Sequence, residues 1–188
     1  MSRDHGEDAT SELVGGEWIG PNAPEVVVGE LLTDRGETLA VAESLTGGLI
    51  GSRITDVPGA SEYFDRGFVT YAYDAKRREL GVDRELLDAH GAVSAPVARR
   101  MAAGARDRSD TTWGVSATGV AGPGATDGTP AGLVYVGVAY AAPWGSEASF
   151  TGSGRFLIDG DRREVKHGSV DRALGELARS IRDREGSA

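Results

Sequence analysis

The chain has 188 residues, no cysteine, and 29 acidic against 20 basic side chains, which gives a formal net charge of −9 at pH 7. The lack of cysteine excludes disulfides, a thiolate zinc site and a cysteine nucleophile, and an acidic chain without a basic stripe argues against nucleic-acid binding. No apolar run approaches the roughly 20 residues that cross a membrane, so we expect no membrane partner and a cytoplasmic location.

Lysine is rare in this chain. Lys76 and Lys166 are the only two lysines, and every other basic side chain is arginine. An acidic, lysine-poor surface is typical of a protein that works in high salt, and the alternative is arginine bias from a GC-rich genome. On either interpretation, a retained lysine is a candidate for a position that arginine cannot fill.

The elements follow from apolar periodicity, caps and turn residues. Residues 1–22 lack the basic start and apolar centre of a signal peptide, so we expect a flexible acidic extension, then one domain over 23–184 and a tail over 185–188. Helices are predicted over 24–34, 49–54, 75–80, 85–89, 94–106 and 161–184, and strands over 38–42, 67–71, 113–117, 133–140 and 148–156. This alternation predicts a single three-layer α/β/α domain with a mixed, largely parallel sheet and an antiparallel edge of late strands.

Ser44 stands where a short buried strand gives way to a helix, within Ala-Glu-Ser-Leu-Thr-Gly-Gly at 42–48. We expect Ser44 or Thr46 to cap this helix and backbone N–H groups of the junction to face an oxyanion or a phosphate. The alternative is an ordinary capped turn, because the stretch lacks the lysine and the length of a P-loop.

Further motifs follow that junction in order. They are Gly67-Phe68-Val69-Thr70-Tyr71 with Lys76 five residues on, His90-Gly91-Ala92-Val93-Ser94, Thr118-Gly119-Val120-Ala121-Gly122-Pro123 and Gly160-Asp161-Arg162. Together with 42–48, and across about residues 24–182, they resemble the CinA C-terminal domain family. In many bacteria that domain follows a larger molybdopterin-binding-like domain, and we expect this short chain to be the stand-alone form.

The resemblance implies a nicotinamide-nucleotide amidohydrolase. Such an enzyme converts nicotinamide mononucleotide to nicotinic acid mononucleotide and ammonia in pyridine-nucleotide recycling. Its partner is therefore a small-molecule nucleotide substrate, no cofactor is expected, and a homodimer or higher homo-oligomer is expected.

Carboxamide hydrolysis needs a nucleophile, a base, an acid for the departing ammonia and donors for the oxyanion. Without cysteine and without an evident histidine triad, a serine–lysine pair is the natural candidate, and the resemblance implies the same residues. We expect Ser44 as nucleophile, Lys76 as base and then acid, and the Tyr71 hydroxyl as a group that orients or relays the proton. Lys76 must be neutral to act, and desolvation in a closed pocket together with a nearby cation such as Arg162 would lower its pKa. The alternative is an ordinary helix-surface lysine.

Substrate-binding residues are expected in three places. Thr46, Gly47 and Gly48 would supply backbone donors, Thr118, Gly119 and Gly122 would contact ribose or phosphate, and Arg162 would pair with phosphate. Glu43 has two interpretations, a partner of neighbouring backbone or a group that holds Lys76. His90 is interpreted as a turn residue, and no cluster at ligand spacing predicts a metal.

Two departures from the family pattern concern substrate binding. Lys166 stands where relatives often carry arginine, and residues 125–130 replace further glycines and a Lys-Pro pair.

Two other functions stay open, a non-catalytic nucleotide-binding module and an amidase for a different small amide.

Overall fold

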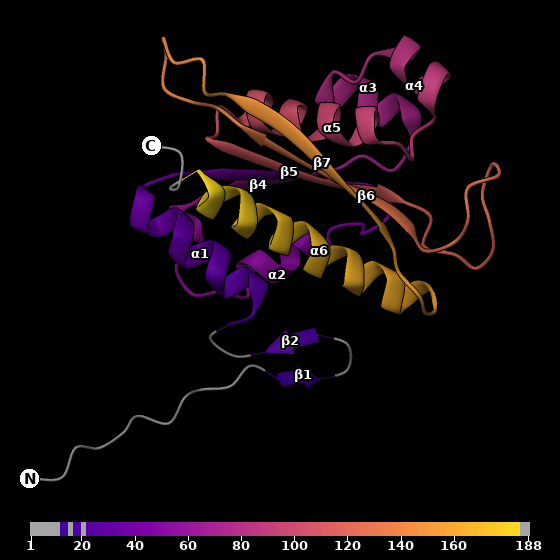
Figure 1. The fold of residues 1–188 in the computed structure, drawn as a ribbon, viewed down its shortest axis with the longest axis horizontal. Coiled ribbons are helices and arrows are strands. Elements are labelled where there is room, and N and C mark those ends of the chain that lie inside the picture. Colours follow the sequence, from indigo (N-terminus) through magenta and orange to yellow (C-terminus); the bar gives the residue numbers. More distant parts are fainter. Residues whose placement is uncertain (1–11, 15–16, 20–21, 185–188) are drawn as a thin grey trace, which may run out of the picture.

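A five-stranded mixed sheet organises the structure, a computed structural model that describes residues 12–14, 17–19 and 22–184. Its strands are β3 (Leu39–Glu43), β4 (Phe64–Val69), β5 (Trp113–Gly119), β6 (Leu133–Tyr140) and β7 (Phe150–Leu157), in the order β4-β3-β5-β6-β7. Strand β3 pairs in parallel with β4 and β5, and β6 and β7 are added antiparallel (Figure 1). The predicted mixed sheet with an antiparallel edge is confirmed.

Helices cover both faces of this sheet. The helices α1 (Pro24–Arg35), α2 (Leu49–Thr55) and α6 (Arg162–Asp183) lie on one face, and α3 (Tyr73–Leu80), α4 (Arg84–His90) and α5 (Ala95–Ser109) lie on the other (Figure 1). Side chains alternate along β3, so Leu39 and Val41 pack in the first layer while Ala40 and Ala42 pack in the second. The three-layer α/β/α architecture is therefore as predicted.

Strand β4 differs from its prediction. It begins at Phe64 and ends at Val69, after the short 3₁₀ helix η1 (Ala60–Glu62), whereas the sequence predicted a strand over 67–71. It pairs only with β3, and the last pair joins Glu43 to Val69, so β4 stops where β3 stops. Tyr71 consequently lies beyond the strand, in the connection to α3.

The N-terminal region contains an element that the sequence reasoning missed. Strands β1 (Glu12–Val14) and β2 (Glu17–Ile19) pair antiparallel within the stretch predicted as a flexible extension. The Gly-Gly dipeptide at 15–16 was a usable hairpin signal. The other residues of the predicted extension up to 21, and the predicted tail at 185–188, lie outside the described residues. No helix of the described ranges is long and apolar enough to cross a membrane.

Two helical glycines face opposite surroundings. A Cβ atom built on Gly104 of α5 would lie 2.1 Å from the carbonyl oxygen of Leu80, at the end of α3. One built on Gly175 of α6 would meet nothing within 4 Å. The close approach of α5 to α3 therefore requires glycine at position 104. Position 175 of α6 has room for a larger side chain.

Alanine at these two glycines gives a matched test of that packing. Both variants gain helix propensity, so Gly175→Ala is expected to raise the free energy of unfolding by up to about 1 kcal/mol. Gly104→Ala is expected to lower it by about 2 kcal/mol, because the methyl group forces α5 away from α3. Urea unfolding followed by circular dichroism measures both, and stabilisation by both variants would contradict the close contact.

Candidate active site

Ser44 and Lys76 meet at the carboxyl end of β3. Ser44 directly follows β3, and Lys76 lies near the start of α3, which follows the neighbouring strand β4. Lys76 Nζ is 2.9 Å from Ser44 Oγ, and the two residues are only 1% and 8% exposed. The interpretation of Lys76 as a helix-surface lysine is therefore wrong.

The surroundings of the Lys76 amine suit a base. Its Nζ lies 2.7 Å from the carbonyl oxygen of Thr70 and 3.3 Å from that of Tyr71, in addition to the Ser44 hydroxyl. Carbonyl oxygens only accept, so a neutral amine donates its two N–H groups to them and directs its lone pair at the hydroxyl. The same three contacts hold the ammonium after it has taken a proton.

Burial lowers the pKa of Lys76 from 10.5 to about 8, because the ammonium loses its hydration in this site. Desolvation is thus the cause of the shift, and the nearby cation considered from the sequence is not required. At pH 7, about a tenth of the amine is then in the form that accepts a proton, and at pH 8 about half.

Glu43 builds the turn from which Ser44 projects. Its buried carboxylate accepts three backbone N–H groups: Oε2 from Gly48 at 2.9 Å and Ile50 at 3.1 Å, and Oε1 from Gly51 at 2.9 Å. These are amides at the start of α2 that otherwise lack partners. Of the two interpretations of Glu43, the partner of neighbouring backbone is confirmed.

The prediction that Ser44 or Thr46 caps α2 is wrong. The N-cap residue is Gly48, which has no side chain to cap the helix. The acceptor is instead the carboxylate of Glu43, in the strand before the turn. Gly47 and Gly48 have φ angles of 65° and 104°, in the left-handed region that favours glycine. This turn keeps the hydroxyl groups of Ser44 and Thr46 away from the first backbone amides of α2.

Unpaired donors remain in the junction. The backbone N–H groups of Leu45, Thr46 and Gly47 have no hydrogen-bond partner among the residues that the structure describes. Of the residues after the serine, Leu45 lines the adjoining cavity, whereas the predicted Thr46, Gly47 and Gly48 do not. The Gly48 N–H is already bound within the α2 cap, so it is not available to a ligand.

A cavity of about 330 Å³ adjoins the Ser44–Lys76 pair. Four regions line it: the β3–α2 junction, the start of α3, the α4–α5 connection, and the loop after β5 with the start of α6. The lining residues are Ser44, Leu45, Tyr71, Tyr73, Lys76, 90–93, 118–122, Thr126, Asp127, Thr129 and Arg162. The parallel strands β3, β4 and β5 all end here, as is usual for ligand sites in open α/β sheets.

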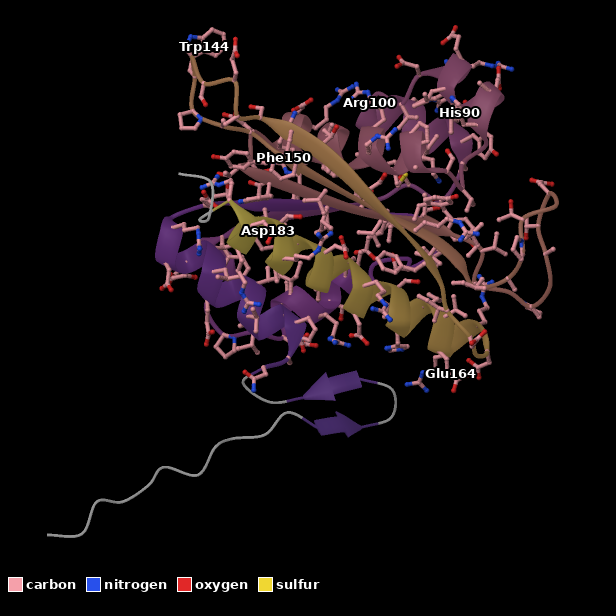
Figure 2. All side chains as sticks on the ribbon, in the orientation of Figure 1. His90, Arg100, Trp144, Phe150, Glu164 and Asp183 are labelled. Carbon is pink, nitrogen blue, oxygen red and sulfur yellow. The ribbon has the colours of Figure 1, made fainter. Side chains whose placement is uncertain are left out.

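The loop after β5 forms one wall of the cavity. The predicted Thr118, Gly119 and Gly122 all line it. Thr118 Oγ1 donates a 2.7 Å hydrogen bond to the carbonyl oxygen of Ala92, which joins this wall to the α4–α5 connection. His90 ends α4 and also lines the cavity; in Figure 2 it lies at the same end of the sheet as the start of α6.

Arg162 and Tyr71 lie together on another side of the cavity. Arg162 is the first residue of α6, and its guanidinium donates to the carbonyl oxygen of Gly122 and, at 3.2 Å, to the Tyr71 hydroxyl. Tyr71 is 63% exposed, while its own carbonyl oxygen contacts Lys76. Two of the guanidinium N–H groups are used in these bonds, which leaves others for a ligand.

Sequence reasoning missed several lining residues. Tyr73 carried a usable signal, because it lies three positions before Lys76 and so shares its helix face; its hydroxyl accepts from the Ala92 N–H. Leu45 carried none. Thr126, Asp127 and Thr129 belong to the segment 125–130 that the sequence analysis associated with substrate binding without assigning single residues. Within the described ranges, no group of three or more His, Asp or Glu side chains is placed to hold a metal ion.

Comparison with known proteins decides the family. The sequence model of the family described as "CinA C-terminal domain" matches residues 22–181. The chain belongs to the CinA C-terminal domain family. CinA-like proteins of Chlorobaculum tepidum and Nostoc punctiforme are 49% identical over 162 residues and 45% identical over 178 residues, covering 86% and 93% of this chain. These matches cover only 38% and 42% of the relatives, so this chain spans less than half of their length.

Solved structures share the fold of this CinA C-terminal domain. The CinA superfamily protein from Enterobacter cloacae matches with a TM-score of 0.79 at 29% identity, over 96% of this chain and 99% of that chain. The competence/damage inducible protein CihA from Agrobacterium tumefaciens matches with a TM-score of 0.75 at 35% identity, over 92% and 99%. The family resemblance of the motifs is confirmed, and because these names state no reaction, the activity is argued from the site.

The lowered pKa of Lys76 predicts that the free energy of unfolding of this CinA C-terminal domain depends on pH. Its folded pKa of about 8 lies below the ordinary 10.5, so between these values the unfolded state binds more protons and the free energy of unfolding rises with pH. At pH values below this window, burial of the charged ammonium lowers the free energy of unfolding by at most about 3 kcal/mol. Urea unfolding across the window measures the rise, which Lys76→Met should remove and Lys166→Met should keep. An unchanged rise in Lys76→Met would assign it to other groups.

Glu43→Gln tests the cap of α2. An amide side chain cannot accept at both ends, so we expect the free energy of unfolding to fall by about 2–3 kcal/mol. The matched control is Glu30→Gln on the exposed side of α1, which should change it by less than about 0.5 kcal/mol. Denaturant unfolding of both variants gives the comparison, and equal losses would refute the special role of Glu43.

Proposed function

We propose that this CinA C-terminal domain is an amidohydrolase that converts nicotinamide mononucleotide to nicotinic acid mononucleotide and ammonia. The observation that carries the proposal is the 2.9 Å contact between Lys76 Nζ and Ser44 Oγ, buried beside a cavity. A serine hydroxyl in contact with a desolvated lysine is the arrangement of a serine–lysine hydrolase. The family resemblance supports the nucleotide amide as the substrate.

Acylation begins with proton transfer from Ser44. Neutral Lys76 takes the hydroxyl proton as Oγ bonds to the carboxamide carbon, and negative charge develops on the carboxamide oxygen. We assign the unpaired N–H group of Leu45 to this oxyanion, because Leu45 directly follows the nucleophile and lines the cavity. The Lys76 ammonium then returns its proton to the nitrogen, the C–N bond breaks, and ammonia leaves an ester on Ser44.

Deacylation reverses these roles. Lys76, neutral again, takes a proton from the attacking water as its oxygen bonds to the ester carbon. It then gives that proton to Ser44 Oγ as the ester bond breaks, which releases the carboxylic acid. Tyr71 is assigned to positioning, because its carbonyl oxygen contacts Lys76 while its hydroxyl is held by Arg162.

The cavity supports a nucleotide as the substrate class. At about 330 Å³ it is within the usual range for small-molecule sites. With the carboxamide at Ser44, the ribose would lie along Thr118 to Gly122, and the phosphate would lie toward Arg162. A guanidinium matches a phosphate with two parallel hydrogen bonds, and Arg162 keeps donors for them.

Ammonia release from nicotinamide mononucleotide in high salt tests the proposal. Ser44→Ala should abolish release with the fold intact, since no other nucleophile is assigned. Lys76→Arg should lower kcat by about 1,000-fold or more, because arginine stays protonated and cannot act as a base. Circular dichroism controls for folding, and normal turnover by Lys76→Arg would refute the mechanism.

The pH profile separates this mechanism from other outcomes. The rate should increase with pH and level off above about pH 8, as Lys76 loses its proton. Binding of the nucleotide without ammonia release would instead support a non-catalytic module. Release of ammonia from another small amide in preference to the nucleotide would reassign the substrate and keep the chemistry.

A further inference from the structure

Two tyrosine side chains line the cavity of the proposed active site and leave much of their surface open. Tyr73, the first residue of α3, is 46% exposed, and Tyr71 is 63% exposed. The Tyr71 hydroxyl is held by Arg162, and its carbonyl oxygen contacts Lys76. Tyr73 therefore remains as an aromatic group of this cavity that the proposed chemistry does not use. An open aromatic face beside a cavity suits a flat ligand.

Hydrogen bonds outside α3 hold the Tyr73 side chain in place. Its hydroxyl accepts from the backbone N–H of Ala92 at 3.2 Å, and the carbonyl oxygen of Ala92 accepts from Thr118 Oγ1 at 2.7 Å. Because Tyr73 precedes Lys76 by three positions, both side chains leave α3 on one face, where Lys76 contacts Ser44. The ring is thus anchored at its hydroxyl end, on the side of α3 that carries the Ser44–Lys76 contact.

One carboxylate lines the cavity in the part of the chain that the structure describes, and it belongs to Asp127. Asp127 and Gly128 have positive φ angles of 48° and 77°, as in a tight two-residue hairpin turn. The flanking Thr126 and Thr129 exchange two backbone hydrogen bonds of 2.9 Å, which close this turn. The Asp127 carboxylate makes no hydrogen bond or ion pair with any described residue, so its charge is available to a ligand.

Side chains of opposite charge therefore line one cavity. Arg162 lines it from the start of α6, and Asp127 lines it from the hairpin turn. A ligand with an anionic end and a cationic end is complementary to such a cavity. Nicotinamide mononucleotide has this property, because its phosphate is anionic and the bond from the ring nitrogen to ribose leaves the pyridine ring with one positive charge.

We propose that Tyr73 and Asp127 select the positively charged ring of the substrate, Tyr73 as the surface on which the ring lies and Asp127 as the carboxylate that balances its charge. The identity of the substrate rests on the proposed function, whereas the preference for a flat cation follows from the open aromatic face and the unpaired carboxylate. A cation over a tyrosine ring is attracted by the ring quadrupole, and the carboxylate adds a Coulomb attraction. Both are specificity residues and take no part in the chemical step.

Reduced nicotinamide mononucleotide is the matched ligand for a test of this proposal. It has the same carboxamide, ribose and phosphate, but its dihydropyridine ring is neutral. Isothermal titration at fixed salt uses Ser44→Ala, which lacks the proposed nucleophile, and should show the charged form bound about tenfold more tightly than the reduced form. In that background, Tyr73→Leu and Asp127→Asn should each weaken the charged form by about fivefold and change the reduced form by less than about twofold.

Three further variants are matched controls. Tyr73→Phe retains the aromatic face and should retain most of the preference for the charged ring. Trp144→Leu removes a fully exposed ring that lies at the other end of the sheet from His90 (Figure 2), and Asp34→Asn removes an exposed carboxylate of α1. These last two should leave both affinities unchanged. Circular dichroism checks the fold of every variant.

Activity gives a second readout, since Asp127→Asn in the otherwise wild-type chain should raise KM for nicotinamide mononucleotide with little change in kcat. Equal affinities for the charged and reduced ligands in Ser44→Ala would overturn the proposal, as would equal losses of both ligands in Tyr73→Leu and Asp127→Asn. A preference for the charged ring that both substitutions remove, with no ammonia release by the wild type, would keep the ring site and reject the amidase. Ammonia release by the wild type with equal affinities would keep the amidase and reject the ring site.

Discussion

One buried carboxylate holds the turn on which the site depends. Glu43 gathers three amides from the start of α2, each of which would be costly to leave unpaired away from water. This fixes α2 against β3 and sets the direction in which the chain leaves the strand. Because side chains alternate along β3, Glu43 faces one helix layer, and Ser44, the next residue, is directed to the layer that contains Lys76. A hydrogen-bond cluster in one layer thus sets the geometry of the Ser44–Lys76 pair in the other.

The two lysines work in contrasting electrostatic settings. Among the residues that the structure describes, the amine of Lys76 contacts only neutral oxygens; a carboxylate in their place would raise its pKa and leave less of it in the neutral form. Lys166 instead lines a cavity together with Arg162 and Arg163, so other cations share its surroundings. Arginine would keep the positive charge at position 166, whereas at position 76 it could not become neutral. The rarity of lysine in the sequence was therefore informative about Lys76, and less so about Lys166.

Sequence patterning predicted the layers, most elements and the meeting of Ser44 with the Thr118 loop, because the carboxyl ends of adjacent parallel strands share an edge. The burial of Lys76 could not be predicted from the sequence pattern, because α3 has the composition of a surface helix. Only the tertiary placement of that helix covers the amine. The α2 cap was misassigned because local rules consider the helix's own first residues, whereas Glu43 reaches it from the preceding strand. Within the segment 125–130, which the sequence analysis associated with substrate binding, Asp127 could not be singled out, because the orientation of that loop depends on the elements around it.

The position of α6 along the chain has a consequence for the order in which the site is assembled. Ser44, Lys76 and Thr118 come from the first two-thirds of the domain, whereas Arg162 begins the final helix of the described structure. During synthesis, Ser44 and Lys76 therefore leave the ribosome well before the cations of α6. That helix must then dock its apolar face on the sheet to bring Arg162 beside Tyr71. The side of the cavity that Arg162 lines is thus the last part of the site that the nascent chain can complete, after the contact between Ser44 and Lys76.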